Sequence, residues 1–177
     1  MQGSNRTGWQ GILAAASLLA TPIVWGQDAE VVDPPEFSPG SNESVVYFVR
    51  ARRVGGAINF FGFVDDVPVG VTRARDFTGA VVPAGERIVW ARSGNVSAIK
   101  VNLEAGKTYY FDQEVRMGGI RARVRLVQLS EEEGMSEAKG LDFKQLTDEG
   151  QERAREIIAA DYAEAKAVAN GESEEDE

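Results

Sequence analysis

The stretch LEAGKTYYFDQEVRMGG, residues 103–119, places a glycine turn before a run of side chains that alternate in character. Successive side chains of an extended strand point to opposite faces. One face would carry Tyr109, Phe111, Gln113 and Val115, and the other Tyr110, Asp112, Glu114 and Arg116. The stretch therefore predicts a strand over 107–116 with the first set in the core and the second set on a solvated face.

Similar strand-forming sequence extends through residues 44–129, where runs of β-branched and aromatic residues are interrupted by turn residues about every eight to twelve positions. Turns are expected where residues tolerate left-handed backbone geometry. These are Asp65-Asp66, Pro83-Ala84-Gly85, Gly94-Asn95 and Glu104-Ala105-Gly106. The expected strands are 44–52, 58–66, 67–72, 76–82, 86–93, 96–103, 107–116 and 120–129. This rhythm predicts a mainly β fold, an antiparallel β-sandwich, over residues 44–134.

After Ser130 the pattern becomes helical and acidic, which predicts a helical extension over residues 135–170. A short helix or turn would lay Met135, Leu141 and Phe143 on the sandwich. A longer helix would begin at Thr147, end at Asn170-Gly171, and carry an apolar stripe of Ala154, Ile157, Ile158, Ala165, Val168 and Ala169. Because alanine dominates, the stripe is a weak docking face, either for the sandwich or for a partner. Residues 171–177 are expected to be a disordered acidic tail.

Residues 1–26 are typical of a signal peptide, because an apolar run of about fifteen residues is short for a membrane span. Cleavage is expected after Gly26, with an uncleaved anchor as the alternative. A Pro- and Ser-rich tether would follow over residues 27–43. No cysteine follows the apolar run, so no lipid anchor is expected. The protein is predicted to be periplasmic or secreted.

The 177 residues include neither histidine nor cysteine, which excludes thiolate nucleophiles, serine triads and zinc sites of the usual kinds. The formal net charge is −9, and residues 131–177 carry −11 of it while residues 1–130 carry +2. The acidic extension would repel nucleic acid and anionic lipid surfaces, which argues against nucleic acid as a partner. We expect no enzymatic activity, no cofactor and no metal.

Four blocks carry a resemblance to a known family: VYFVRARRVGGAINFFGFVDDVPVG (46–70), VVPAGERIVWAR (81–92), VNLEAGKTYYFDQEVRMGG (101–119) and RVRLVQLSEEEG (123–134). Together the chain resembles the bacterial envelope domain of unknown function 2846, and also the PEGA-like surface modules with a Pro-x-Gly turn. The resemblance implies an exported, immunoglobulin- or PEGA-like sandwich with no agreed activity. Many members of that family are lipoproteins, whereas this chain lacks the lipid-attachment cysteine and adds an acidic helix.

Arg121, Arg123 and Arg125 alternate with apolar residues and would form a row on one face. Such a row costs free energy unless negative charge opposes it. The internal candidates are Asp112, Glu114 and the acidic extension. The external candidate is an anionic ligand, such as a glycan, a lipid head group or an acidic peptide. The basic, glycine-rich residues 51–56 form either an anion cradle of backbone amides or a flexible hairpin.

Two further patterns contain residue types that could support catalysis or sugar binding. Asp112 and Glu114 have about the spacing of the carboxylate pair of a glycoside hydrolase, but no other feature builds a cleft, so packing and solubility are favoured. Trp90 and Tyr110 have side chains that stack on sugars, although Trp90 follows Ile88 in phase and a core position is favoured.

These observations predict an exported, non-enzymatic β-sandwich that acts as an accessory or binding module in the bacterial cell envelope. Its acidic helix would contact an envelope protein. The alternative is a carbohydrate- or anionic-ligand-binding domain that uses Arg121, Arg123 and Arg125. An exposed edge strand would also allow two copies to pair as a dimer.

Overall fold

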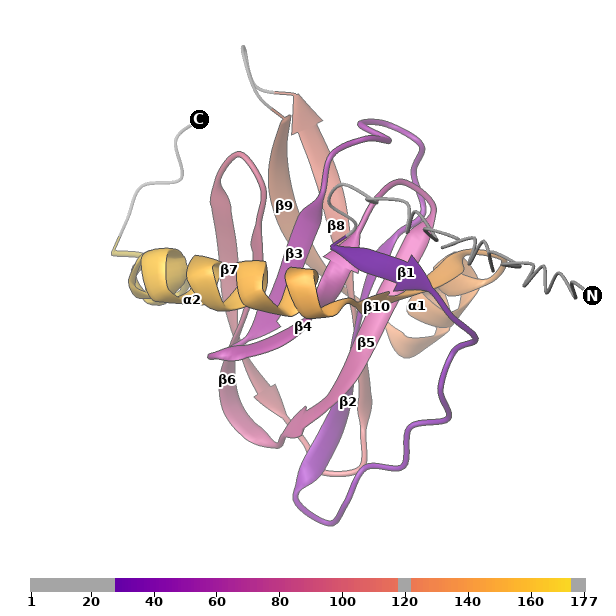
Figure 1. Ribbon diagram of the computed structural model, residues 1–177. Helices are drawn as coiled ribbons and strands as arrows, with labels where there is room; N and C mark the ends of the chain where they lie inside the picture. Colours follow the sequence, from indigo (N-terminus) through magenta and orange to yellow (C-terminus); the bar gives the residue numbers. More distant parts are fainter. Residues whose placement is uncertain (1–27, 118–121, 173–177) are drawn as a thin grey trace, which may run out of the picture.

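The structure is a computed structural model that describes residues 28–117 and 122–172, and this part of the chain is mainly β (Figure 1). One sheet has the strand order β1-β10-β5-β2-β8-β9, and the other has the order β4-β3-β6-β7. The strands are β1 (Ala29–Val31), β2 (Glu43–Arg50), β3 (Phe60–Val64), β4 (Val67–Thr72), β5 (Asp76–Pro83), β6 (Gly85–Arg92), β7 (Val96–Leu103), β8 (Thr108–Met117), β9 (Ala122–Leu129) and β10 (Asp142–Leu146). The helices are α1 (Glu131–Ala138) and α2 (Asp148–Ala169).

The eight strands expected between residues 44 and 129 are confirmed as β2 to β9, but their pairing is not purely antiparallel. β2 runs parallel to β8, and β10 runs parallel to β5. The remaining strand pairs are antiparallel. Each parallel pair joins strands that are distant in sequence, so no short hairpin forces them to run in opposite directions.

Both flanks of the predicted β-region differ from expectation. Three residues of the expected tether form β1, which pairs with β10, and β10 itself occupies a segment expected to be helix or turn. Phe37, also in the expected tether, lies with its ring centroid 5.8 Å from that of Tyr47. Phe143 is buried as expected, but Met135 is exposed. Apolar side chains from both flanks, including Phe37 and Phe143, cover the outer face of the six-stranded sheet. The composition of these segments, which is typical of turns, does not indicate this packing.

The main core lies between the two sheets and is centred on aliphatic and aromatic side chains such as Val46, Phe48 and Phe111. Gly62 allows the sheets to approach, because a Cβ atom at this position would lie 2.5 Å from Cδ2 of Phe48. Real Cβ contacts are longer, so no larger residue fits without displacing the Phe48 ring.

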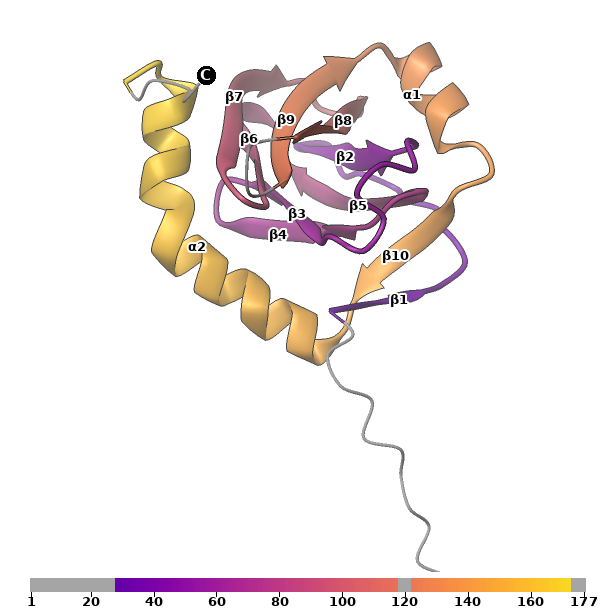
Figure 2. The same ribbon diagram turned by 90° about the horizontal axis from the view of Figure 1, so that it is seen from above.

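α2 covers the outer face of the four-stranded sheet (Figure 2). Every residue of the predicted apolar stripe packs in this second cluster, together with Phe61, Phe63, Trp90 and Tyr162. The predicted cap is confirmed, since the Thr147 hydroxyl accepts a hydrogen bond from the Gly150 amide at 3.1 Å. The stripe therefore docks on the body of the same chain. No helix of the described residues is long and apolar enough to cross a membrane.

The edge of β9 is partly occupied by side chains from the neighbouring sheet. Asn95 accepts from the Val124 amide at 2.8 Å and donates to the Val124 carbonyl at 3.1 Å. The Leu126 amide donates to the Ser97 hydroxyl at 3.0 Å. A second copy pairing at β9 would have to displace these bonds, and β1, at the other edge of that sheet, has only three residues. An edge-to-edge dimer stays a prediction.

Candidate functional site

The strands run between two ends of the molecule that carry opposite charge. At the first end, which we call the arginine end, β2, β4, β6 and β8 finish and β3, β5, β7 and β9 begin, at the top of Figure 1. Among the described residues, the strand ends and loops at 50–60, 72–76, 92–96, 114–117 and 122–123 contain two carboxylates, Asp76 and Glu114. The same segments contain Arg50, Arg52, Arg53, Arg73, Arg75, Arg92, Arg116 and Arg123.

The opposite end, which we call the acidic end, has the reverse composition. Its segments at 40–44, 64–67, 83–86 and 103–108 contain Glu43, Asp65, Asp66, Glu86 and Glu104, with Lys107 as their one cation. The residues of each end come from separate parts of the sequence, and strand pairing brings them together. The sequence indicated two parts of this end separately, the β9 arginines and the basic residues 51–56, but not that they lie at the same end of the molecule.

Arg50 is buried at the arginine end and organises the loop of residues 51–59. Its guanidinium donates to the carbonyl oxygens of Ile58 at 2.6 Å, Val54 at 3.0 Å and Gly55 at 2.7 Å, and lies 4.0 Å from the centroid of the Phe60 ring. Burial lowers the pKa of Arg50 from its ordinary value. The loop therefore turns three carbonyls inward toward an internal cation, an arrangement that the sequence reasoning did not foresee.

The predicted arginine row is partly opposed from within, and Arg121 lies outside the described residues. The β8–β9 register places Arg125 opposite Glu114 and Arg123 opposite Arg116. Glu114 Oε2 accepts from Arg116 Nη2 at 2.8 Å and lies 3.9 Å from Arg125 Nη1. Glu114 is thus the predicted internal partner of Arg125, and it is shared with a second guanidinium.

Asp112 was expected on a solvated face, and this prediction is wrong. It is 7% exposed, because α1 packs over the outer face of β8 and places Gly134 against Tyr110. Burial, and next the nearby Glu137, raise the pKa of Asp112 to about 6. Tyr110 is buried with it, so the face predicted to be solvated is half covered by a helix.

A groove of about 570 Å³ lies where α2 meets the arginine end. Two guanidinium groups line it, but both are paired: Arg92 with Asp161 at 2.6 Å and Arg153 with Asp28 at 3.2 Å. Its apolar lining comes from Ile58, Phe61, Ala122 and Ile157. The groove is therefore amphipathic, whereas the loops beside it hold the excess positive charge.

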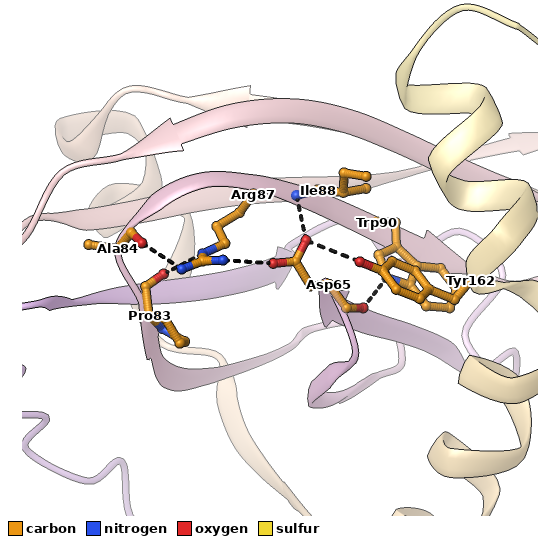
Figure 3. A network of polar contacts seen from close by, with 7 residues as sticks. All are labelled: Asp65, Pro83, Ala84, Arg87, Ile88, Trp90 and Tyr162. Carbon is orange, nitrogen blue, oxygen red and sulfur yellow. Dashed lines mark hydrogen bonds and ion pairs between the residues drawn. The ribbon is translucent and has the colours of Figure 1, made fainter.

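The Asp65 turn at the acidic end fastens α2 to the four-stranded sheet (Figure 3). Asp65 has a φ of 50°, as expected for this turn, and its carboxylate accepts from the Ile88 amide at 2.9 Å and from the Tyr162 hydroxyl at 3.4 Å. Its carbonyl accepts from Trp90 Nε1 at 2.8 Å. Burial, and next the Asp65 charge, raise the pKa of Tyr162.

Trp90 is buried as expected and is sealed beneath α2. Its ring centroid lies 4.1 Å from that of Phe63 and 6.0 Å from that of Tyr162. Trp90 therefore has no face free for a sugar. Tyr162 was missed from the sequence, although it lies between Ile158 and Ala165 at the helical spacing of the stripe.

In the described part of the chain, no three acidic side chains lie close enough together to hold a metal ion. No family model matches the sequence. An uncharacterized protein of Haemophilus influenzae is 30% identical over 98 residues, which cover 55% of this chain and 58% of that protein. The solved NMR structure of a protein from Eubacterium rectale has a TM-score of 0.35 and 12% identity, covering 55% of this chain and 98% of that one. Neither name states an activity.

Proposed function

We propose that the protein is an exported, non-enzymatic binding module that serves another component of the bacterial cell envelope. In this proposal residues 1–26 are a signal peptide, and the mature chain is periplasmic or secreted without a lipid anchor. The two sheets form an immunoglobulin- or PEGA-like sandwich related to the envelope domain of unknown function 2846. The order of the four matching sequence blocks supports that relationship.

The ligand we propose is anionic, and the observation that carries this proposal is the charge of the arginine end. The segments of the arginine end carry eight described arginines and two carboxylates, although Arg50 is buried and Arg92 is paired with Asp161 of α2. One of the two carboxylates, Asp76, is buried and accepts from the Arg73 amide at 2.9 Å. Guanidinium groups bind phosphate, sulfate and carboxylate through paired hydrogen bonds. The β9 row considered from the sequence is one part of this larger surface.

Like charges at facing strand positions support the same proposal. Arg116 and Arg123 are directly opposed at the ends of β8 and β9. Such a pair destabilises a sheet unless negative charge lies nearby. Glu114 contacts Arg116 and lies near Arg125, so the strand pairing gathers positive charge around one carboxylate, and an anion bound beside Arg116 would meet that concentrated charge.

The surroundings of the two carboxylates considered for hydrolysis support a non-enzymatic role. Asp112 is buried beneath α1, and Glu114 is engaged by Arg116. The chain has no histidine or cysteine to supply another nucleophile or base. Neither of the two carboxylates considered for hydrolysis is therefore both exposed and unpaired.

A protein partner of the envelope, if bound through α2, would meet its acidic outer face, because the apolar stripe is occupied. Glu152 and Glu164 are exposed on that face. We would compare crosslinked partners of the full chain with those of a Glu152→Gln/Glu164→Gln variant. Loss of a specific captured protein would support this second candidate, and an unchanged capture pattern would argue against it.

Titration calorimetry with a short sulfated oligosaccharide tests the anion site, with the uncharged oligosaccharide of equal length as the ligand control. The double substitution Arg53→Gln/Arg116→Gln is expected to weaken binding about tenfold, since it removes two charge-assisted contacts. Lys100→Gln/Lys107→Gln removes the same charge elsewhere, including Lys107 at the acidic end, and should leave affinity nearly unchanged. Equal losses in both variants would show that net charge, and not the arginine end, governs binding.

A further inference from the structure

We propose that the arginine end docks on the surface of an anionic phospholipid membrane, with Val54, Ile58 and Met117 entering the head-group region. This inference rests on the proposed anion-binding function and names the anion as the lipid phosphate. What distinguishes a membrane from a soluble anion is the presence of exposed apolar side chains among the arginines.

Large exposed apolar side chains are concentrated at this end. Val54 is 52% exposed, Ile58 37% and Met117 75%. Among the described residues, two others are comparable: Val31 on β1 and Met135 on α1. The arginine end therefore presents three of the five most exposed large apolar groups next to its densest positive charge.

Ile58 and Met117 lie on neighbouring parts of one surface, and Val54 lies in the same loop as Ile58. A Cβ atom at Gly55 would lie 3.5 Å from Ile58 Cδ1 and 3.5 Å from Val115 Cγ1, so the loop of residues 51–59 packs on the end of β8. Met117 follows Val115 by two residues and so lies on the same face of β8. Met117 also pairs with Ala122, which lines the groove together with Ile58.

The combination of arginine with exposed apolar side chains fits a membrane surface better than it fits a soluble ligand. A sulfated glycan or a free phosphate would engage arginine but leave Val54 and Met117 in water. A bilayer surface satisfies both kinds of side chain, because lipid phosphates lie at the depth where apolar groups begin to leave water. Exposed apolar groups ringed by polar residues mark such interaction sites.

The arrangement of the molecule allows the end to approach a membrane despite the net charge of −9. The acidic end lies at the opposite tips of the strands, and α2 crosses them at about mid-height in Figure 1. Repulsion by the carboxylates of the acidic end is screened beyond a Debye length of about 8 Å at physiological salt. Two carboxylates of α2, Glu156 and Asp161, line the groove beside Ile58, and Asp161 is paired there with Arg92. When the arginine end makes contact, its own charges are therefore the ones that dominate.

Vesicle co-sedimentation tests the inference with a chain that begins at residue 27, which contains every residue of both sheets and both helices. Vesicles with 30% phosphatidylglycerol in phosphatidylcholine should bind it at least tenfold more tightly than vesicles of phosphatidylcholine alone. Val54→Ser/Met117→Ser should weaken that binding about fivefold or more. Val31→Ser/Met135→Ser, which removes two equally exposed apolar groups away from this end, should have no effect. Circular dichroism and the urea unfolding midpoint verify that each variant is folded.

The outcomes separate this inference from the proposed function. Binding of the sulfated oligosaccharide without binding to anionic vesicles would overturn the membrane proposal and leave the anion site standing. Vesicle binding that is unchanged in Val54→Ser/Met117→Ser would overturn the insertion of apolar side chains. Failure to bind either probe would overturn both proposals. Loss of vesicle binding in both Val54→Ser/Met117→Ser and Arg53→Gln/Arg116→Gln, with the control variant unaffected, would support the inference.

Discussion

Tyr162 of α2 donates its hydroxyl hydrogen to the carboxylate of Asp65, a residue 97 positions earlier in the chain, over a distance of 3.4 Å. The same turn residue accepts from the Trp90 indole through its carbonyl, and the Tyr162 ring lies against Trp90. One turn thus fixes both the helix and the central tryptophan of the sheet. It gives α2 a defined position that an alanine-rich stripe alone would specify weakly.

Replacement of Asp65 should loosen this attachment. Asp65→Ala removes the acceptor for the Ile88 amide and for Tyr162, and it removes the ion pair with Arg87. We expect a loss of about 1–3 kcal/mol in the free energy of unfolding, measured by urea denaturation. The neighbouring Asp66→Ala is the control, because Asp66 is exposed and should cost less than about 0.5 kcal/mol. Similar losses for the two variants would contradict a specific role for Asp65.

A charge beneath α2 should detach the helix from the sheet. Ala165 is fully buried in the helix–sheet cluster, so Ala165→Glu would place a carboxylate among Trp90 and its neighbours. We expect a destabilisation of about 3 kcal/mol or more and a red shift of tryptophan emission in the chain that begins at residue 27. Ala163→Glu introduces the same charge on the exposed face of α2 and should leave the emission unchanged. An unshifted spectrum for both would mean that α2 does not cover Trp90.

Glycine at position 134 is required by packing and not by helix geometry. Gly134→Ala would normally stabilise a helix by about 1 kcal/mol, but here the added Cβ would overlap the Tyr110 ring. We expect a net destabilisation of roughly 1–3 kcal/mol in urea unfolding. Ser136→Ala, at an exposed position of the same helix, should be neutral or slightly stabilising. A stabilising Gly134→Ala would show that α1 does not pack on β8.

The buried Asp112 carboxyl should make stability depend on pH. Its pKa is raised from 3.8 to about 6, chiefly by burial and then by Glu137 and Glu114, while Arg52 and Arg50 oppose the shift. A group whose pKa is higher in the folded state binds its proton more tightly there, so stability should fall as pH rises from about 4 through 6. Urea unfolding at pH 4, 5, 6 and 7.5 measures this dependence.

The variant Asp112→Asn isolates the contribution of that carboxyl. At pH 7.5 it should be more stable than the parent chain by on the order of 1 kcal/mol, once solvent screening is allowed for. Between pH 4 and 6 its stability should change less with pH than that of the parent. If the two chains show the same pH dependence, Asp112 is not the group responsible.

The sequence predicted best those features that are repeated locally. Alternation along each strand, turn residues between strands and the helical stripe were sufficient to find β2 to β9 and α2 with its Thr147 cap. Trp90 was assigned to the core from its phase with Ile88 alone. These features depend on neighbours within a few residues, where the geometry of a strand or helix determines which side chains share a face.

Features that depend on distant contacts were not predicted. The position of Asp112 in the alternating strand pattern predicts a solvent-exposed side chain, and no neighbouring residue indicates that α1 will cover it. The three residues of β1 form a strand because they pair with β10. The clustering of arginines at one end likewise cannot be predicted from any single segment, because strand pairing brings its loops together.

The pairing of β1 with β10 also sets an order of assembly. Ala29 lies opposite Leu146, and Val31 opposite Lys144, so the first described strand has no partner until synthesis has passed residue 146. Because synthesis proceeds from the N-terminus, the segment at the beginning of the domain is among the last to be fixed in place. Contacts this distant in sequence also slow folding, since a long loop must close before they form. β1 therefore stays without its strand partner until β10 has been made, and the closing of this pair joins the two flanks of the β-region.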